Sequence, residues 1–273
     1  MIGAIGGDII GSVYERHNTK TMDFPLFDRW CTFTDDTVMT AAIADAILSG
    51  HDYGTKLKEW YRLYPERGYG PGFRRWAAHN RVTTRHSMGN GSAMRVSPIG
   101  FAFGTLEVVL EEAKKSAEPS HNHPEGIKGA QAVASAIFLA RTGSGKAEIK
   151  EYVEGAFGYN LGTSIDAIRP RYRFDATCPG SVPQAITAFL ESEGYEDAVR
   201  KAISLGGDSD TIACIAGGIA EAFYGMPEHI RITVLGMLDD RLRMTVSAFE
   251  LRYDTLAKHR ALQDNTLRGN GPT

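Results

Sequence analysis

Residues 206–220 read GGDSDTIACIAGGIA. From Ile212 to Ala220 this stretch carries no charge, and its alanines and glycines allow another helix to approach its backbone closely. We therefore predict a helix over Ile212–Tyr224 that lies buried near the centre of an all-α domain.

Helical spacing of apolar residues extends along most of the chain, and alternating strand patterns are nearly absent. After Asp35, for example, Val38, Ala42 and Ala46 mark one apolar face. Glycine and proline clusters separate these segments, as they do at helix ends. We expect further helices over Gly3–Tyr14, Asp35–Ser49, Ala93–Phe103, Leu106–Ala117, Ile127–Arg141, Pro183–Leu190, Ala198–Leu205 and Leu238–Leu256.

The sequence shows no linker, low-complexity segment or convincing internal repeat that would divide it. We therefore predict one all-α domain over residues 1–258, followed by a disordered polar tail over residues 259–273. Two segments rich in Gly, Pro and polar residues, Thr19–Cys31 and Arg67–Arg95, are long enough to be functional loops.

Charge and cysteine content narrow the class of protein. The chain has 273 residues, a formal charge of −3 and no block of Lys and Arg, which argues against binding a nucleic acid or an acidic membrane. Cys31, Cys178 and Cys214 fit no disulfide or zinc pattern, and no apolar run is long enough to cross a bilayer. We expect a soluble, cytoplasmic monomer.

Two acidic clusters lie far apart in the chain, each at the start of an apolar helix: Thr34-Asp35-Asp36-Thr37 and residues 206–211. Together they offer four carboxylates and several hydroxyls, with no histidine or cysteine among them. Such an all-oxygen ligand set suits Mg²⁺ or Mn²⁺. Capping of the two helices by Thr34 and Asp208 is the alternative, and the two interpretations are compatible.

A glycine-rich segment offers a second kind of chemistry. Gly89-Asn90-Gly91-Ser92 precedes a helix-like segment, so its backbone N–H groups can approach an anion such as a pyrophosphate. An ordinary Asn-Gly turn explains the same residues. The upstream stretch Arg67–Gly72 is another glycine-rich loop, in which Tyr69 offers a ring-stacking surface.

Three other polar groups carry less information on their own. Glu15 follows the first expected helix, where a lone glutamate is usually solvated. His121 and His123 stand two residues apart before Pro124, a poor spacing for zinc outside a strand, so capping or hydrogen bonding to a ligand fits better. Asp239-Asp240 is followed by Arg241 and Arg243 and is interpreted as a solvated helix start.

Taken together, the motifs closely resemble the ADP-ribosylglycohydrolase family, which includes the enzymes that reactivate ADP-ribosylated dinitrogenase reductase. The resemblance runs in order from about residue 2 to Tyr224, and five motifs in the correct order are highly specific. The stretches that carry it are Gly7–Glu15, Phe33–Thr37, Gly89–Arg95, His121–Pro124 and Gly206–Ile212.

The resemblance implies a compact, orthogonal, all-α multi-helix bundle with a binuclear Mg²⁺ or Mn²⁺ site. It implies a role in acid/base catalysis or substrate gating for Glu15, and places His121 near the diphosphate of ADP-ribose or its proximal ribose. Tyr69 and Phe73 are candidates for the adenine platform. The implied metal ligands are Thr34, Asp35, Asp36, Asp208, Asp210 and Thr211, with Asp36 and Asp208 also catalytic, and the implied diphosphate loop is Gly89, Asn90, Gly91 and Ser92.

The function implied by the resemblance is hydrolysis of the glycosidic bond that joins ADP-ribose to a substrate, with ADP-ribosylarginine in protein as the first candidate. Another ADP-ribosyl linkage, whether O-linked, on nucleic acid or on a small molecule, is the nearest alternative. A non-catalytic ADP-ribose-binding protein and a metal-dependent phosphohydrolase are the others, and the latter would release phosphate or AMP.

Overall fold

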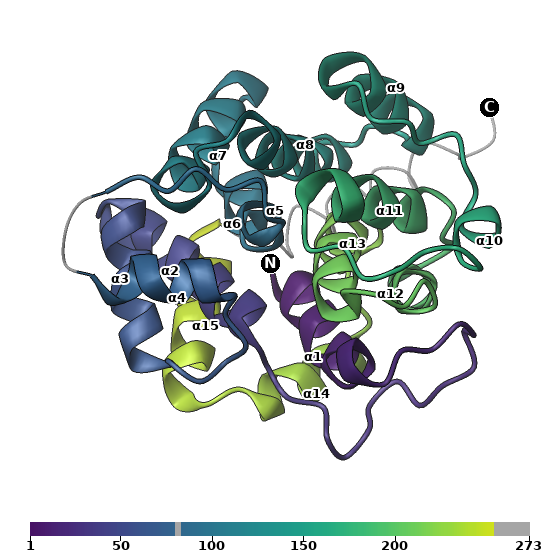
Figure 1. The fold of residues 1–273 in the computed structure, drawn as a ribbon, viewed down its shortest axis with the longest axis horizontal. Coiled ribbons are helices and arrows are strands. Elements are labelled where there is room, and N and C mark those ends of the chain that lie inside the picture. The colour runs from purple at the N-terminus through teal and green to yellow at the C-terminus, as the bar shows by residue number, and fades with distance from the viewer. Residues whose placement is uncertain (80–82, 254–273) are drawn as a thin grey trace, which may run out of the picture.

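A computed structural model describes residues 1–79 and 83–253, and these residues fold into helices joined by turns and loops (Figure 1). No strand is formed within the described ranges, where the one isolated β-bridge joins Gly89 to Thr177. The prediction of an all-α fold is therefore confirmed. The helices are α1 (Ile2–Arg16), α2 (Asp35–Ser49), α3 (Tyr53–Leu63), α4 (Pro71–Ala78), α5 (Gly91–Met94), α6 (Ser97–Ala102), α7 (Leu106–His121), α8 (Pro124–Arg141), α9 (Lys146–Phe157), α10 (Ile165–Ile168), α11 (Cys178–Leu190), α12 (Tyr195–Ile203), α13 (Ser209–Tyr224), α14 (Glu228–Met237) and α15 (Asp240–Tyr253).

Helix α13 occupies the middle of the molecule, as its sequence predicts. It packs against α1, α8, α11 and α12, and Figure 1 shows it with α1, α11 and α12 around it. Its residues from Ser209 to Ala222 are all buried, so no face of the helix is left for solvent. A helix without a polar face is stable only in such a position.

The contact between α1 and α13 is the most extensive helix pair in the described part of the chain, and glycines make it possible. A Cβ added to Gly7 would lie 2.0 Å from the carbonyl oxygen of Ala213, and one added to Gly3 would lie 2.6 Å from that of Gly217. A Cβ on Gly11 would lie 2.6 Å from the Cα of Asp210. The two backbones therefore touch along three successive turns of α1.

Most of the expected helices are confirmed, with extensions at their ends. The helix expected over Leu106–Ala117 continues through Pro119 to His121, and the one expected from Pro183 begins at Cys178, where the side chain of Thr177 caps it. Ala93–Phe103 is divided between the short helices α5 and α6.

Helices α3, α4, α9, α10 and α14 were not expected from the sequence. Helix α4 lies inside Arg67–Arg95, so the prediction of one long loop there is wrong in part. Its start at Gly70-Pro71 resembles a loop in the sequence, although Pro is well suited to the first turn of a helix. Phe73, Trp76 and Ala77 form its buried face. The tail predicted over residues 259–273 lies outside the described residues. Every helix that the structure describes is too short or too polar to span a membrane.

Adding one methyl group at Gly7 tests the α1–α13 contact. We expect Gly7→Ala to lower the free energy of unfolding by about 3 kcal/mol, the upper end for overpacking, because backbone atoms rather than a flexible side chain must move. Gly155→Ala in α9 is the matched control: no atom of the described residues lies within 4 Å of its Cβ position, so the better helix propensity of Ala should raise stability by up to about 1 kcal/mol. Urea titration of the three proteins measures both effects, and equal stabilities would contradict the contact.

Candidate active site

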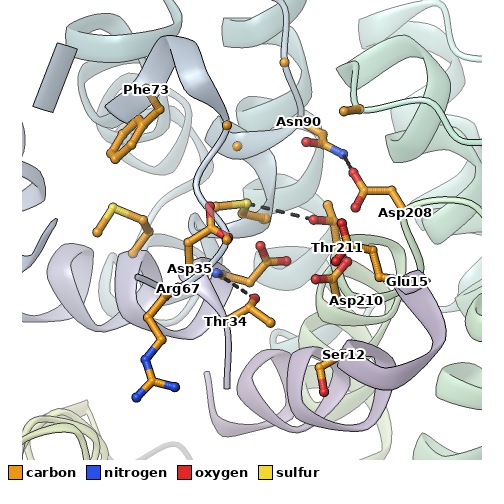
Figure 2. Close-up of a pocket in the computed structure, with 18 of the residues that line it drawn as sticks. Ser12, Glu15, Thr34, Asp35, Arg67, Phe73, Asn90, Asp208, Asp210 and Thr211 are labelled. Atoms are coloured by element: carbon orange, nitrogen blue, oxygen red, sulfur yellow. Dashed lines mark hydrogen bonds between the residues drawn. The ribbon is translucent and has the colours of Figure 1, made fainter. Parts of the chain in front are cut away.

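A cavity of about 720 Å³ opens where the C-terminal end of α1, the N-terminal ends of α2 and α13, and the loop before α5 meet (Figure 2). Residues from both acidic clusters line it, although 168 residues of chain separate the two clusters. The structure therefore brings the two clusters together, as expected. The predicted site residues that line the cavity are Glu15, Thr34, Asp35, Asp36, Gly89, Asn90, Gly91, His121, Asp208, Asp210 and Thr211.

The first cluster is held in place by Asp8 of α1, a residue that sequence reasoning missed. The Asp8 carboxylate is fully buried and accepts hydrogen bonds from the backbone N–H groups of Thr34 and Thr37, both 3.0 Å long. It also accepts from both threonine hydroxyls, with Thr34 Oγ1 at 2.6 Å. The Thr34 hydroxyl in turn accepts from the backbone N–H of Asp36, so the predicted N-cap is confirmed. Asp8 thus fixes the direction in which Asp35 and Asp36 leave the helix start.

The second cluster begins with two glycines in the left-handed region, Gly206 at φ 67° and Gly207 at φ 73°. They turn the chain into α13, where Asp208 holds the N-cap position without a capping hydrogen bond from its side chain. The Asp208 carboxylate instead accepts from Asn90 Nδ2 at 2.6 Å. The capping interpretation of Asp208 is therefore wrong: its carboxylate faces the cavity and the glycine-rich loop.

Three carboxylates converge closely in this cavity. One oxygen each of Glu15, Asp208 and Asp210 lie within 4.8 Å of one another, and the three labelled side chains gather at one side of Figure 2. Asp35 faces them from the start of α2 in the same view. The sequence around Glu15 does not by itself identify it as a site residue; only the family resemblance predicted this role. The structure places it directly in the acidic group.

Burial makes these carboxylates hard to ionise. It raises the pKa of Asp36 and of Asp210 well above the usual value of 3.8, and the negative charges of their neighbours raise both further. The pKa of Glu15 is raised by burial first and by the charge of Asp208 second. Among the described residues, no group hydrogen-bonds the buried Asp36 Oδ2.

This donor set fits a hard divalent cation. It consists of carboxylate and hydroxyl oxygens alone, it includes a buried oxygen atom without a partner, and its charges repel one another until a cation lies between them. Thr34 has one oxygen lone pair left after its two hydrogen bonds, so it remains able to act as a ligand.

The glycine-rich loop lies beside the acidic group and over His121. Asn90 N donates to Ala176 O at 2.9 Å, which holds the loop against the segment that precedes α11. A Cβ on Gly91 would lie 3.0 Å from His121 Nε2, and one on Gly89 would lie 3.4 Å from it, so the glycines leave room for the imidazole. Ser92 is buried, donates to Gly126 O at 2.7 Å, and is not among the described residues that line the cavity.

The two histidines have separate roles. His123 Nδ1 accepts from the backbone N–H of Glu125 at 3.1 Å and caps α8, which confirms the capping interpretation for this residue. His121 is buried at the cavity wall, and burial, with smaller contributions from Arg95 and Arg85, lowers its pKa well below 6.5. Its imidazole is therefore neutral at physiological pH.

The aromatic candidate Phe73 lies apart from the acidic residues in Figure 2. Phe73 lines the cavity and is labelled in Figure 2, whereas Tyr69 stacks behind it with ring centroids 5.4 Å apart. Both rings are buried, Tyr69 at 4% and Phe73 at 8% exposed, and of the two candidates only Phe73 reaches the cavity.

Comparison with known proteins shows the family and the fold of this chain. The family described as ADP-ribosylglycohydrolase matches residues 1–264. The chain is 27% identical to the ADP-ribosylhydrolase ARH3 of Mus musculus, over 84% of this chain and 83% of that protein. It is also 27% identical to the ADP-ribosylarginine hydrolase Tri1 of Pseudomonas putida, over 71% of this chain and 59% of that protein. A solved structure titled ADP-ribosylglycohydrolase-related protein complex has the same fold, with a TM-score of 0.69 at 22% identity over 93% of this chain and 96% of that one.

Replacing Asp8 by asparagine tests how the start of α2 is held. The amide NH₂ cannot accept hydrogen bonds. One donor of Thr34 and Thr37 loses its partner if the NH₂ takes the place of Oδ1, and three lose it if the NH₂ takes the place of Oδ2, so we expect stability to fall by about 1–3 kcal/mol. Asp52→Asn, at the exposed N-cap of α3, is the matched control, because Asn caps as well as Asp. Thermal unfolding distinguishes them, and equal losses would refute the anchoring role of Asp8.

The raised pKa of Asp36 predicts how stability depends on pH without divalent cations. A carboxyl with a raised folded pKa stabilises the protein fully below its unfolded pKa, near 3.8, and this contribution is lost as pH rises through the folded pKa. In EDTA, Asp36→Asn should therefore gain stability relative to the wild type as pH rises from 5 to 8. The gain is about 1.4 kcal/mol for each pKa unit titrated in this range. Urea titrations at each pH measure it, and a difference that does not change with pH would count against the raised pKa.

Proposed function

This chain belongs to the ADP-ribosylglycohydrolase family, and we propose that it is a metal-dependent hydrolase that releases ADP-ribose from ADP-ribosylated substrates. The bond cleaved would be the glycosidic bond at the anomeric carbon of the distal ribose. The observation that carries the proposal is the convergence of Glu15, Asp208 and Asp210 in one cavity with the unpartnered buried oxygen of Asp36. A cavity of about 720 Å³ also lies within the usual range for pockets that bind small molecules and cofactors.

We propose that the cavity holds two Mg²⁺ or Mn²⁺ ions. When bound, such ions orient the ribose hydroxyls and lower the pKa of a water molecule, so that hydroxide is available near neutral pH. Three observations support this assignment. Each proposed ligand lines the cavity, the donor atoms are all oxygens, and the carboxylates repel one another. The proposed ligands are Thr34, Asp35, Asp36, Asp208, Asp210 and Thr211.

We also propose that two of the carboxylates act directly in the cleavage of the glycosidic bond. Cleavage of a glycoside passes through a transition state with positive charge on the ring, and Asp36 and Asp208 would stabilise that charge or accept the proton of the attacking water. Asn90 donates to Asp208 Oδ2 and so fixes the orientation of that carboxylate. We assign Asp36 and Asp208 as catalytic residues on these grounds.

Glu15 is assigned the role of proton donor to the leaving group. It is half-buried beside Asp208, and burial raises its pKa, which favours the protonated form that a general acid needs. The demand on Glu15 depends on the substrate, because a guanidinium nitrogen and a serine oxygen differ as leaving groups. A change of Glu15 is therefore expected to affect different linkages unequally.

The rest of the cavity suits the ADP moiety. Gly89, Asn90 and Gly91 bring backbone close to the cavity beside the neutral His121, which is the arrangement expected around the diphosphate and its ribose. Ser92 stabilises this loop through Gly126 rather than by facing the cavity. Phe73 offers the ring surface for adenine. Our first candidate for the substrate is ADP-ribosylarginine in protein, and the nearest alternative is an O-linked, nucleic-acid-linked or small-molecule adduct of ADP-ribose.

The deciding experiment is product analysis by mass spectrometry after incubation with arginine-ADP-ribosylated protein in Mg²⁺, in Mn²⁺ and in EDTA. We expect release of intact ADP-ribose that needs the metal and falls at least about 100-fold in Asp36→Ala. Asp23→Ala, which removes an exposed carboxylate from the loop after α1, is the control and should retain full activity.

The other outcomes discriminate between the alternatives. Release of AMP or phosphate would identify a phosphohydrolase, and full activity of Asp36→Ala would refute the proposed mechanism. Inactivity on the arginine linkage together with activity on an O-linked or nucleic-acid-linked substrate would reassign the substrate within the same function. Calorimetric binding of ADP-ribose without turnover of any linkage would identify a binding protein.

A further inference from the structure

Arg95 is a buried cation for which the site described so far has no use. Its side chain is 0% exposed, and the residue lies at the wall of the cavity that holds the acidic group. Its Nη2 donates to Ser116 O and to Ser120 Oγ, both at 2.8 Å, whereas Nε and Nη1 have no hydrogen-bond partner in the described part of the chain. Burying a charge costs free energy unless the charge is paired and hydrogen-bonded, and no described carboxylate pairs with Arg95.

Arg95 is connected to His121 by hydrogen bonds through Ser120. Ser120 Oγ, which accepts from Arg95 Nη2, also lies 2.8 Å from His121 Nδ1. A guanidinium has no acceptor atom, so Ser120 Oγ must accept from Arg95 and its own proton is free to be donated onward. The acceptor within reach is His121 Nδ1. In a neutral imidazole whose Nδ1 accepts, the proton is on Nε2.

The proton assigned to Nε2 is directed at the glycine-rich loop. Nε2 lies 3.0 Å from the Cβ position of Gly91 and 3.4 Å from that of Gly89, and His121 lines the cavity there. The loop is the part of the site where we place the diphosphate. An N–H donor at this point attracts an anion, whereas the lone pair of the other tautomer would repel it.

We propose that Arg95 is a positioning residue: through Ser120 it holds His121 in the Nε2–H tautomer, so that the ring donates to a phosphate oxygen of the substrate. The proposal rests on the function proposed above for the substrate, but the state of the ring is a property of the protein alone. The charge of Arg95 also acts on the ring of His121, and no described carboxylate pairs with it.

The arrangement of α7 supplies matched variants. Ser116 and Ser120 are both fully buried, one turn apart on α7. The Ser116 hydroxyl donates to Ala113 O and takes no part in the path to His121, since Arg95 bonds only its backbone carbonyl. Ser120→Ala therefore breaks the path, and Ser116→Ala removes the same atom from the same helix without breaking it.

The test is the tautomer of His121, read from the ring ¹⁵N shifts of the substrate-free protein, together with calorimetric binding of ADP-ribose in the presence of Mg²⁺. We expect a single Nε2–H tautomer in the wild type and in Ser116→Ala, and a mixture of tautomers in Ser120→Ala with ADP-ribose bound about 10-fold more weakly. Arg95→Met should give the same mixture of tautomers and weaken ADP-ribose binding at least as much, because it also removes a positive charge, and Ser120→Ala should add nothing to it in the double variant.

Four results would overturn the proposal: a proton on Nδ1 in the wild type, an unchanged tautomer in Ser120→Ala, equal losses in the two serine variants, or additive losses in the double variant with Arg95→Met. If the large change at Arg95 prevents folding, the two serine variants still decide the question. If the wild type has the Nε2–H tautomer but does not bind ADP-ribose, the result would count against the proposed function. It would not contradict the role of Arg95 in fixing the tautomer of His121.

Discussion

The direct backbone contact between α1 and α13 is the constraint on which the rest of the structure depends. Gly7 allows the carbonyl of Ala213 to lie where a Cβ would be, and Gly11 does the same at the start of α13. Each glycine inside a helix costs about 1 kcal/mol relative to alanine, so the contact must return more than this in packing. It also sets the chemistry, because Glu15 near the end of α1 and Asp210 at the start of α13 are brought together by the same crossing.

The cluster of carboxylates in the cavity lowers the stability of the fold. Its carboxylates are buried and close together, and they are held there by interactions behind them: Asp8 fixes the start of α2, and Asn90 fixes Asp208. Because burial and mutual repulsion raise the pKa of Asp36 and its neighbours, the bare site opposes its own ionisation. Such strain is common at functional sites, where the rest of the fold must over-determine a geometry that is unfavourable by itself.

Sequence reasoning worked where one local pattern sufficed. The uncharged run of α13 and the two acidic clusters were sufficient to predict a buried central helix and a joint oxygen-rich site. Asp8 was missed because a single aspartate in an apolar helix resembles an interruption, and its partners lie 26 and 29 residues away. A usable signal existed: Asp8 and Glu15 are two helical turns apart, so they share a face of α1. The role of Glu15 needed the family resemblance, since one glutamate carries no pattern.

The cavity has two ends of opposite character, and this polarity determines how an ADP-ribosyl group would lie in it. The acidic end repels phosphates unless cations compensate it, whereas Arg95 and the N–H of His121 favour an anion at the glycine-rich loop. Asn90 joins the ends, because its side chain donates to Asp208 while its backbone belongs to the loop. A diphosphate at the loop then leaves the distal ribose toward the carboxylates and adenine toward Phe73. The reverse orientation would bring phosphates onto the acidic group and leave the buried guanidinium without an anion.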